Sequence, residues 1–260
     1  MDNRENYWNN GYFEYFKDLI SRTNEQESSA ESARLATSDQ NYRNAIELLG
    51  IIKDQPVLEM GSGFGRGIPL IYAYSKYVFS TDISEVMIDF AKKTYLPLCP
   101  EVQFKVCQAE NTEFDSHFFQ HIVCFAVFDA LYQQKALEEM NRVLKVGGTL
   151  LVTGKNTFYL NADAEAFDAE VGARKKGHPN CFTNVPKLLS YLDALGFSLV
   201  SHRYYVKRGD FLKEKFQIEI PEKFYEYMLV LKKEKDIVIP IGELSLSEPF
   251  SETYKDITKG

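Results

Sequence analysis

Short apolar runs alternate with amphipathic stretches from residue 55 onward. Five of these runs predict β-strands, because polar or turn-forming residues bound each of them: 56–60, 77–81, 102–107, 121–126 and 149–153. Apolar residues at helical spacing follow several of the runs, as in Val86, Met87, Phe90 and Ala91. Strands that alternate with helices favour parallel pairing, because each parallel neighbour needs a crossover connection. The pattern therefore predicts an α/β fold built on a doubly wound, mainly parallel sheet.

Further helices and strands are predicted on either side of this core. A helical preface is predicted before the first strand by apolar residues at helical spacing: Tyr12, Tyr15, Phe16, Leu19, Ile20, Tyr42, Ile46 and Leu49. The polar stretch 21–40 between them fits either a mobile link or a weakly amphipathic helix. Later, Thr183 or Asn184 can cap a helix opened by Pro186. Two final strands are predicted at 197–205 and 224–231, with a packed insertion at 206–223 and a further edge strand at 237–241.

Charge and cysteine content narrow the possible partners. A total of 30 Lys and Arg against 37 Asp and Glu gives a net charge of −7, which repels a phosphate backbone and predicts no nucleic-acid partner. The four cysteines lack the close spacing of a zinc or redox motif, so we expect no metal site and a reducing compartment. Met1 leads into polar residues, and no apolar run approaches the roughly 18 residues of a membrane span. We therefore expect a cytoplasmic protein without a membrane partner; the sequence leaves its oligomeric state open.

The most informative segment, residues 57–67 (VLEMGSGFGRG), runs from an apolar strand through a glycine-rich turn into a helix. Glycines let the backbone adopt positive φ and approach a ligand, while the N–H groups of the following helix face the same site. The dinucleotide fingerprint G-x-G-x-x-G needs a third glycine where this chain has Arg66 or Ile68, which weakens a nicotinamide interpretation. No Gly-Lys-Ser or Gly-Lys-Thr follows, so the turn is not a P-loop.

The turn and the segments after it resemble class I S-adenosylmethionine (SAM) dependent methyltransferases. The first motif of that family, an acidic residue followed by G-x-G-x-G, is matched by Glu59, Gly61, Gly63 and Gly65. In the same order as in the family, Asp82 ends the second strand, QAE (108–110) follows the third, and LKVGG (144–148) precedes the fifth. The resemblance covers residues 56–153. It implies SAM as the cofactor and a seven-stranded, Rossmann-like methyltransferase sheet.

The resemblance also implies which residues hold the cofactor: Glu59, Gly61, Gly63, Gly65, Asp82, Ile83, Gln108, Ala109 and Phe125. Asp82 can accept hydrogen bonds from both ribose hydroxyls, or it can cap the helix that follows. Glu59 is expected to order the turn and to hold the methionine ammonium group. Gln108 and Ala109 are expected at the adenine edge, and Ile83 and Phe125 in the walls of the site.

Two glutamines depart from the family pattern. The family usually has Asp where this chain has Gln108, although a Gln carbonyl can still accept a hydrogen bond from the adenine amino group. It often has Asp where this chain has Gln120, which we interpret as a strand-start residue without a ligand contact.

The acceptor of the methyl group should lie beyond the carboxyl ends of the strands, where doubly wound sheets bind ligands. Residues 125–131 and 154–159 therefore offer candidates: Asp129, Tyr132, Lys155, Asn156 and Tyr159. We expect His178, in a basic loop, and Tyr159 to be the catalytic residues, with His178 as the base. Aromatic residues in the preface form either a lid over the acceptor or a helix that merely packs on the sheet: Tyr7, Trp8, Tyr12, Phe13 and Phe16.

These features predict three regions in the chain. A helical cap spans 1–50, a SAM-binding core 51–155, and the remainder of the same catalytic domain, with substrate-side insertions, 156–260. The expected function is in-line transfer of a methyl group from SAM to an oxygen or nitrogen of a small soluble molecule. The sequence holds no Asn-Pro-Pro-Tyr or Asp-Pro-Pro-Tyr after the fourth strand and no Pro-Cys, which disfavours nucleic-acid methylation. The alternatives are a nicotinamide-dependent oxidoreductase and a non-catalytic SAM-binding module.

Overall fold

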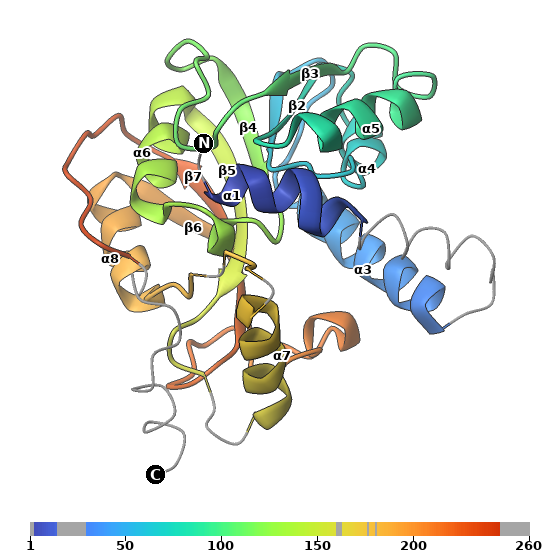
Figure 1. Ribbon diagram of the computed structural model, residues 1–260. Helices are drawn as coiled ribbons and strands as arrows, with labels where there is room; N and C mark the ends of the chain where they lie inside the picture. The colour runs from blue at the N-terminus through green and yellow to red at the C-terminus, as the bar shows by residue number, and fades with distance from the viewer. Residues whose placement is uncertain (1–2, 15–29, 160–162, 176, 180, 245–260) are drawn as a thin grey trace.

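The computed structural model describes residues 3–14, 30–159, 163–175, 177–179 and 181–244. Its centre is a seven-stranded sheet with the order β3-β2-β1-β4-β5-β7-β6 (Figure 1). The strands are β1 (Val57–Met60), β2 (Val78–Asp82), β3 (Gln103–Val106), β4 (Phe119–Cys124), β5 (Leu144–Lys155), β6 (Phe197–Tyr205) and β7 (Glu226–Lys233). Strands β1 to β5 pair in parallel, and β7 is antiparallel to both of its neighbours. The predicted seven-stranded, mainly parallel sheet is confirmed.

Helices cover both faces of this sheet. They are α1 (Asn3–Asn6), the π-helical η1 (Tyr7–Tyr12), α3 (Ala30–Glu47), α4 (Ile68–Tyr72), α5 (Glu85–Tyr95), α6 (Gln133–Val143), α7 (Ala164–Lys175) and α8 (Val185–Ala194), with short 3-10 turns η2 (Phe128–Ala130) and η3 (Phe211–Lys213). Buried side chains of α6 and α8 share one hydrophobic cluster with β4, β5 and β7. Those of α3, α4 and α5 form a second cluster on the other face. Alternating strand side chains supply both clusters, as the continuous apolar runs of a doubly wound sheet require.

Most predicted elements are present, and their ends have identifiable causes. The Asn184 side chain accepts a hydrogen bond from the Lys187 N–H at 3.1 Å, so Asn184 rather than Thr183 caps α8. Residues 30–40 are helical in α3, which decides that part of the polar stretch in favour of a helix. Strand β5 begins at Leu144, five residues before the predicted start, because Leu144 already pairs with Phe119, and the register shifts before Thr149 pairs with His121.

The predicted edge strand at 237–241 is wrong. Side chains of α6, rather than a neighbouring strand, form hydrogen bonds with two backbone groups of this segment. The Ile237 carbonyl accepts a hydrogen bond from Asn141 Nδ2 at 2.9 Å, and the Ile241 N–H donates to Glu138 Oε1 at 3.3 Å. The segment is therefore fastened along α6, and β6 remains the edge of the sheet.

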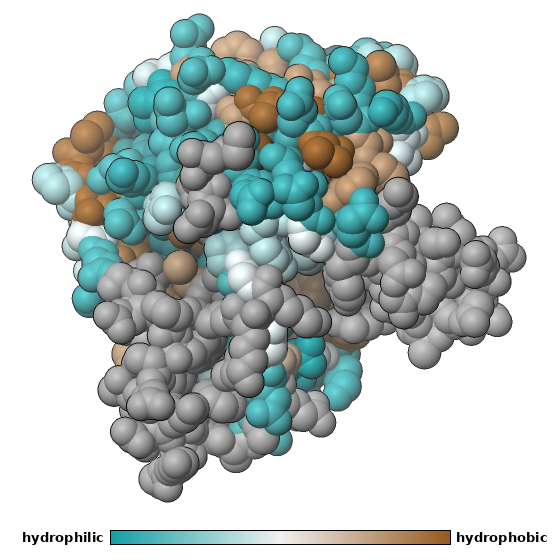
Figure 2. All heavy atoms as spheres, in the orientation of Figure 1, coloured by the Kyte–Doolittle hydropathy of each residue, from teal (hydrophilic) through white to brown (hydrophobic). Residues whose placement is uncertain are grey.

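The carboxyl ends of β1, β2, β4 and β5 point to the same edge of the sheet, where the site is built. The N-terminal segment of α1 crosses in front of this edge, between the side that carries α4 and α5 and the side that carries α6 (Figure 1). On the face shown in Figure 2, hydrophilic side chains predominate and the hydrophobic ones lie in several small groups. Among the described residues, no helix is long and apolar enough to cross a membrane.

Candidate functional site

The glycine-rich turn connects β1 to α4 and brings backbone to the carboxyl edge of the sheet. Gly61, Gly63 and Gly65 all have positive φ, at 72°, 51° and 80°. A Cβ on Gly61 would overlap Val127, and a Cβ on Gly65 would lie 2.7 Å from Ile68 Cδ1. A Cβ on Gly63 would meet only Met87 Sδ, at 3.9 Å, so Gly63 faces open space. The first and third glycines thus let the turn pack against the protein, and the second exposes backbone to a ligand.

Asp82 holds this turn from the end of β2. Its Oδ2 accepts a hydrogen bond from the Gly63 N–H at 2.9 Å, and its Oδ1 accepts one from the Ser84 N–H at 2.9 Å. Burial raises the pKa of Asp82 above its ordinary value, although these backbone bonds oppose the shift. The cap of α5 is Ser84, whose Oγ accepts from the Met87 N–H. The helix-cap interpretation of Asp82 is therefore wrong, and its carboxylate is placed at the ligand side of the strand end.

Glu59 is buried beneath the same turn, with 4% of its surface exposed. Ser80 Oγ donates to its Oε2 at 3.3 Å, and Thr81 Oγ1 donates to its backbone carbonyl at 3.0 Å. Burial raises the pKa of Glu59 to about 8, which the Ser80 hydrogen bond opposes. In the absence of a cationic partner, this carboxyl group is therefore largely protonated at neutral pH.

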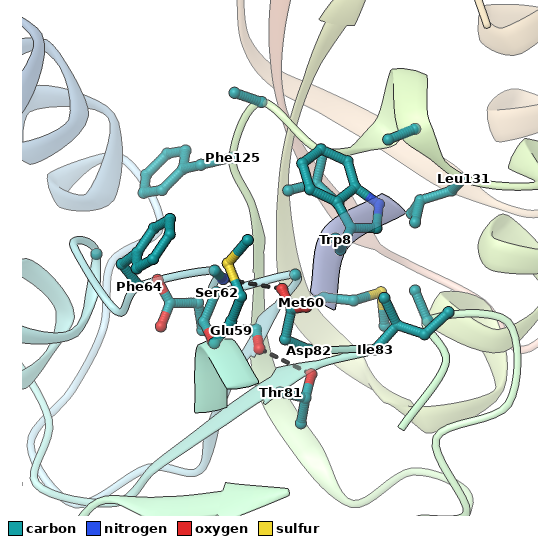
Figure 3. Close-up of a pocket in the computed structure, with 18 of the residues that line it drawn as sticks. Trp8, Glu59, Met60, Ser62, Phe64, Thr81, Asp82, Ile83, Phe125 and Leu131 are labelled. Atoms are coloured by element: carbon teal, nitrogen blue, oxygen red, sulfur yellow. Dashed lines mark hydrogen bonds between the residues drawn. The ribbon is translucent and has the colours of Figure 1, made fainter. Parts of the chain in front are cut away.

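A cavity of about 250 Å³ lies over the turn. In Figure 3, Phe64 and Phe125 lie on one side of it, Trp8, Ile83 and Leu131 on the other, and Asp82 between them. Ser62 Oγ is buried in its wall without a hydrogen-bond partner among the described residues. A mainly apolar cavity with few convergent polar groups is typical of a small-molecule site. Two strand-end carboxyl groups, an unpartnered hydroxyl and exposed glycine backbone fit the ribose and the ammonium group of SAM.

Most of the predicted cofactor residues line this cavity: Glu59, Gly61, Gly63, Asp82, Ile83, Ala109 and Phe125. Gly65 and Gln108 do not. Gly65 supports the turn from behind, and Gln108 is an exposed residue bridged to Asn111. Gln120 lies in β4, where its Nε2 donates to the Gly147 carbonyl at 3.1 Å, away from the cavity.

The two predicted catalytic residues lie in different surroundings. His178 lines the cavity, and its ring is 5.4 Å from that of Tyr7 and 5.2 Å from that of Trp8. Burial lowers the pKa of His178, and its Nδ1 has no hydrogen-bond partner among the described residues. Tyr159, by contrast, is 5% exposed and packs in an aromatic cluster with Phe182 and Tyr225, outside the cavity. The structure therefore brings His178, but not Tyr159, to the predicted cofactor site.

The aromatic preface contributes two cavity residues, Trp8 and Tyr12. The other residues predicted for it are Tyr7, which packs on His178, Phe13, which stacks on Phe64 at 5.9 Å, and Phe16, which lies outside the described residues. An ion pair between Arg4 and Glu110, at 2.6 Å, fixes the segment to the loop after β3.

Several residues that line the cavity had no role assigned from the sequence, among them Arg4, Tyr42 and Glu110. Glu110 belongs to the QAE segment of the family pattern, which could have indicated it. Arg4 and Tyr42 come from the preface and from α3, whose positions depend on tertiary packing.

A second, smaller cavity of about 100 Å³ lies beyond the ends of β4 and β5. It shares Tyr42 and Ala126 with the first cavity. Its walls include Asp129 and Lys155, two of the residues expected near the methyl group, and Lys155 Nζ lies 2.9 Å from Asp129 Oδ2. Ala126 adopts the left-handed conformation (φ 51°), and its N–H donates to Thr153 Oγ1 at 2.6 Å. Non-glycine residues in this conformation cluster at functional sites.

Comparison with known proteins agrees with the fold described above. The family described as "Methyltransferase domain" matches residues 58–152, which run from the second residue of β1 into β5. A demethylmenaquinone methyltransferase of Clavibacter sepedonicus is 24% identical over 185 residues, 64% of this chain and 75% of that protein. The ubiquinone/menaquinone biosynthesis C-methyltransferase UbiE of Bordetella parapertussis is 35% identical over 100 residues, 37% of this chain. That match spans 39% of the Bordetella protein.

Solved structures share the fold at low sequence identity. The geranyl diphosphate C-methyltransferase of Streptomyces coelicolor A3(2), solved with Mg²⁺, geranyl diphosphate and S-adenosyl-L-homocysteine, aligns over 90% of this chain and 98% of its own. The TM-score is 0.63 and the identity 14%. The YcgJ protein of Bacillus subtilis aligns over 76% of this chain and 99% of its own, with a TM-score of 0.57 and 15% identity.

Proposed function

The chain belongs to the class I SAM-dependent methyltransferases, and on this premise we propose that it methylates an oxygen or nitrogen nucleophile of a small soluble molecule. The observation that carries the proposal is the arrangement of the two cavities. The first joins Glu59, Gly63 and Asp82 at the strand ends, and the second opens beside it at Ala126. Such an arrangement provides room for a cofactor and, next to it, for an acceptor.

When bound, SAM supplies a methyl group on a positively charged sulfur, which is already electrophilic. The protein therefore needs to bind the cofactor, align the acceptor and exclude water. Asp82 would hold the ribose hydroxyls, and Glu59, once ionised, would bind the methionine ammonium group. Ile83 and Ala109 would contact the adenine, as the resemblance implies, and Phe125 would wall the methionine end.

His178 remains our candidate for a base on the first cavity. It reaches the wall from the loop between α7 and α8, and its lowered pKa keeps the imidazole neutral at pH 7, so that Nδ1 can accept a proton. Tyr159 lies too deep in its aromatic cluster to contact an acceptor in this conformation.

A carbon acceptor is the second candidate, because the named relatives from Bordetella and Streptomyces are C-methyltransferases. The charged residues of the second cavity, Asp129 and Lys155, favour a polar acceptor over an apolar ring. The position of the new methyl group in the product, determined by NMR, distinguishes the two candidates.

The test is transfer of an isotopically labelled methyl group from SAM to the small-molecule fraction of a cell extract. We expect one labelled product and an equal amount of S-adenosylhomocysteine, with RNA and DNA unlabelled. A parallel titration with NAD and with S-adenosylhomocysteine addresses the nicotinamide alternative. Binding of NAD in place of S-adenosylhomocysteine, or label in nucleic acid alone, would refute the proposal.

A further inference from the structure

Glu226 lies at the centre of three neighbouring strands at the edge of the second cavity. It is the first residue of β7, and it pairs in register with Lys155 of β5 and with Tyr205 of β6. Opposed residues of antiparallel strands carry their side chains on the same face, with Cβ atoms about 5 Å apart. All three residues line the second cavity, so the sheet register itself places a carboxylate, an ammonium group and a phenol together.

This cavity carries more negative than positive charge. Lys155 Nζ lies 2.9 Å from Asp129 Oδ2 and 3.1 Å from Glu170 Oε1, so this one ammonium group already forms ion pairs with two carboxylates. Glu226 is a third carboxylate, and it forms no hydrogen bond or ion pair with any described residue. Glu226 is half-buried, and a partly desolvated carboxylate without a partner is stabilised by a cationic ligand.

Other titratable groups face Glu226 from the surrounding elements. Arg208, in the exposed loop after β6, is the remaining cation. The phenols of Tyr42, Tyr205 and Tyr225 are the others, and burial raises the pKa of each of them, so they stay neutral near pH 7. These groups do not neutralise the excess carboxylate inside the cavity.

Aromatic rings form the rest of the cavity wall. Tyr42 and Tyr205 lie 5.2 Å and 5.3 Å from Phe211, measured between ring centroids, and Tyr227 completes the wall. Aromatic faces attract cations through their quadrupoles, and an aromatic cage with a carboxylate is suited to an ammonium group. The combination disfavours a neutral hydroxyl compound or an anion.

The aromatic cage also lies next to the cofactor cavity. Tyr42 and Ala126 line both cavities, and the Tyr42 ring contacts that of Phe125 at 4.0 Å between centroids. A nucleophile held near Glu226 therefore lies on the side of the cofactor cavity where Glu59 and Phe125 are found.

We propose that the second cavity binds a small amine as the methyl acceptor, and that Glu226 is the catalytic base that deprotonates its ammonium group. This inference rests on the proposed function. The ammonium N–H donates its proton to a Glu226 oxygen, and the free lone pair then forms a bond to the methyl carbon of SAM. The carbon–sulfur bond breaks with its electron pair going to sulfur, which leaves S-adenosylhomocysteine and a methylammonium product. Glu226 afterwards releases its proton to solvent.

The ionisation of Glu226 suits this role. Burial raises its pKa to about 7, and the charge of Lys155 limits the rise. Near neutral pH the carboxylate can therefore accept a proton and return it. If Glu226 is the base, activity falls below about pH 7 as its carboxylate is protonated; for His178, whose pKa is lowered from 6.5, the fall would come at lower pH.

The first arm of the test measures binding. Tetramethylammonium is the cationic probe and tert-butanol its neutral counterpart, each titrated by proton NMR into protein saturated with S-adenosylhomocysteine. We expect tetramethylammonium to bind in preference to tert-butanol, and Glu226→Gln to weaken its binding about tenfold or more. Glu222→Gln, at an exposed carboxylate four residues earlier, is the matched control and should bind like the wild type. Equal binding of both probes, or full binding by Glu226→Gln, overturns the inference.

The second arm measures turnover with propylamine and benzylamine against propanol and benzyl alcohol. We expect methylation of the amines only, a decrease of about 100-fold or more in kcat for Glu226→Gln, and loss of the acid limb near pH 7 in that variant. Preferential methylation of the alcohols, or an unchanged pH profile, overturns the inference. Unaltered affinity for S-adenosylhomocysteine shows that Glu226→Gln is folded.

Failure of this inference and failure of the proposed function give different results. If S-adenosylhomocysteine does not bind the wild type, the cofactor assignment fails. The titration with tetramethylammonium alone still decides whether the aromatic cage and Glu226 form a cation site.

Discussion

At the scale of single residues, Asp82 holds the glycine-rich turn and is also the residue that we propose for binding the ribose. Its carboxylate already accepts hydrogen bonds from Gly63 and Ser84, and further lone pairs remain for two ribose hydroxyls. We expect Asp82→Ala to cost about 1–3 kcal/mol of SAM affinity, because the hydroxyls would be buried without acceptors. Asp82→Asn keeps an acceptor oxygen and should cost less. Calorimetric titration with S-adenosylhomocysteine measures both, and Asp89→Ala, at an exposed residue of α5, is the control. Wild-type affinity in Asp82→Ala would contradict the ribose assignment.

Glu59 gives a prediction about pH. Its pKa is about 8 in the folded protein and 4.5 ordinarily, so the folded state binds more protons than the unfolded state between these values. The free energy of unfolding should therefore decrease as pH rises from about 4.5 to 8. Glu59→Gln removes this contribution, and we expect it to exceed the wild type in stability by at least ~1 kcal/mol at pH 8 but not at pH 4. Urea unfolding at several pH values measures the effect, with exposed Glu219→Gln as the control. Parallel pH dependences for Glu59→Gln and the wild type would contradict it.

At the scale of elements, the glycine turn separates folding from binding. Gly63→Val adds a side chain that points into open space, so the sheet should fold with a penalty of about 1–2 kcal/mol for the positive φ. Because the same space belongs to the cofactor cavity, SAM binding should be lost. Gly61→Ala, whose Cβ overlaps Val127, should instead lower the melting temperature most. Thermal unfolding and binding of S-adenosylhomocysteine, measured for both variants, test the distinction. Normal cofactor binding by Gly63→Val would mean that the turn is only structural.

The secondary-structure elements also show which features local sequence patterns can predict and which they cannot. Apolar periodicity and the Asn184–Pro186 cap predicted the strands of the sheet and α8, because burial on both faces and capping are local properties. The segment 237–241 has the composition of a strand, yet Asn141 and Glu138 of α6 satisfy its backbone. No local pattern indicates that a side chain 96 residues away will replace a neighbouring strand.

At the scale of the whole molecule, the residues proposed to bind the cofactor were easier to bring together from the sequence than those proposed to bind the acceptor. Glu59, Gly63 and Asp82 lie at strand ends in a fixed sequence pattern, so the fold places them together. Glu226 begins β7 more than 160 residues after the turn, and only the antiparallel register of β5, β6 and β7 brings it opposite Lys155 and Tyr205. Tyr159 was misplaced for the same reason, since packing against Phe182 and Tyr225 draws it away from the cavity.

The last prediction concerns the N-terminal segment, which contacts parts of the chain that are distant in sequence and lies against the first cavity. Trp8 and Tyr12 line that cavity, and Arg4 pairs with the buried carboxylate of Glu110. A lid confined to the acceptor would spare SAM affinity when removed, whereas these contacts place the segment against the cavity that we propose for the cofactor. We therefore expect deletion of residues 1–14 to lower both turnover and affinity for S-adenosylhomocysteine. Trp8→Ala alone should cost about 1–3 kcal/mol of that affinity, because the indole lines the cavity and would cover apolar surface of a bound ligand.

Asn10→Ala is the matched control, since Asn10 is exposed two residues further along and its side chain bonds, within the described part of the chain, only to Asn6. Asn10→Ala should bind S-adenosylhomocysteine like the wild type. Trp8→Ala and the deletion of residues 1–14 should both have melting temperatures within a few degrees of the wild type. If Trp8→Ala and the deletion retain full affinity but lose turnover, the segment closes over the acceptor alone. If they retain both, the segment only packs on the sheet, and the cofactor is held by the strand ends without it.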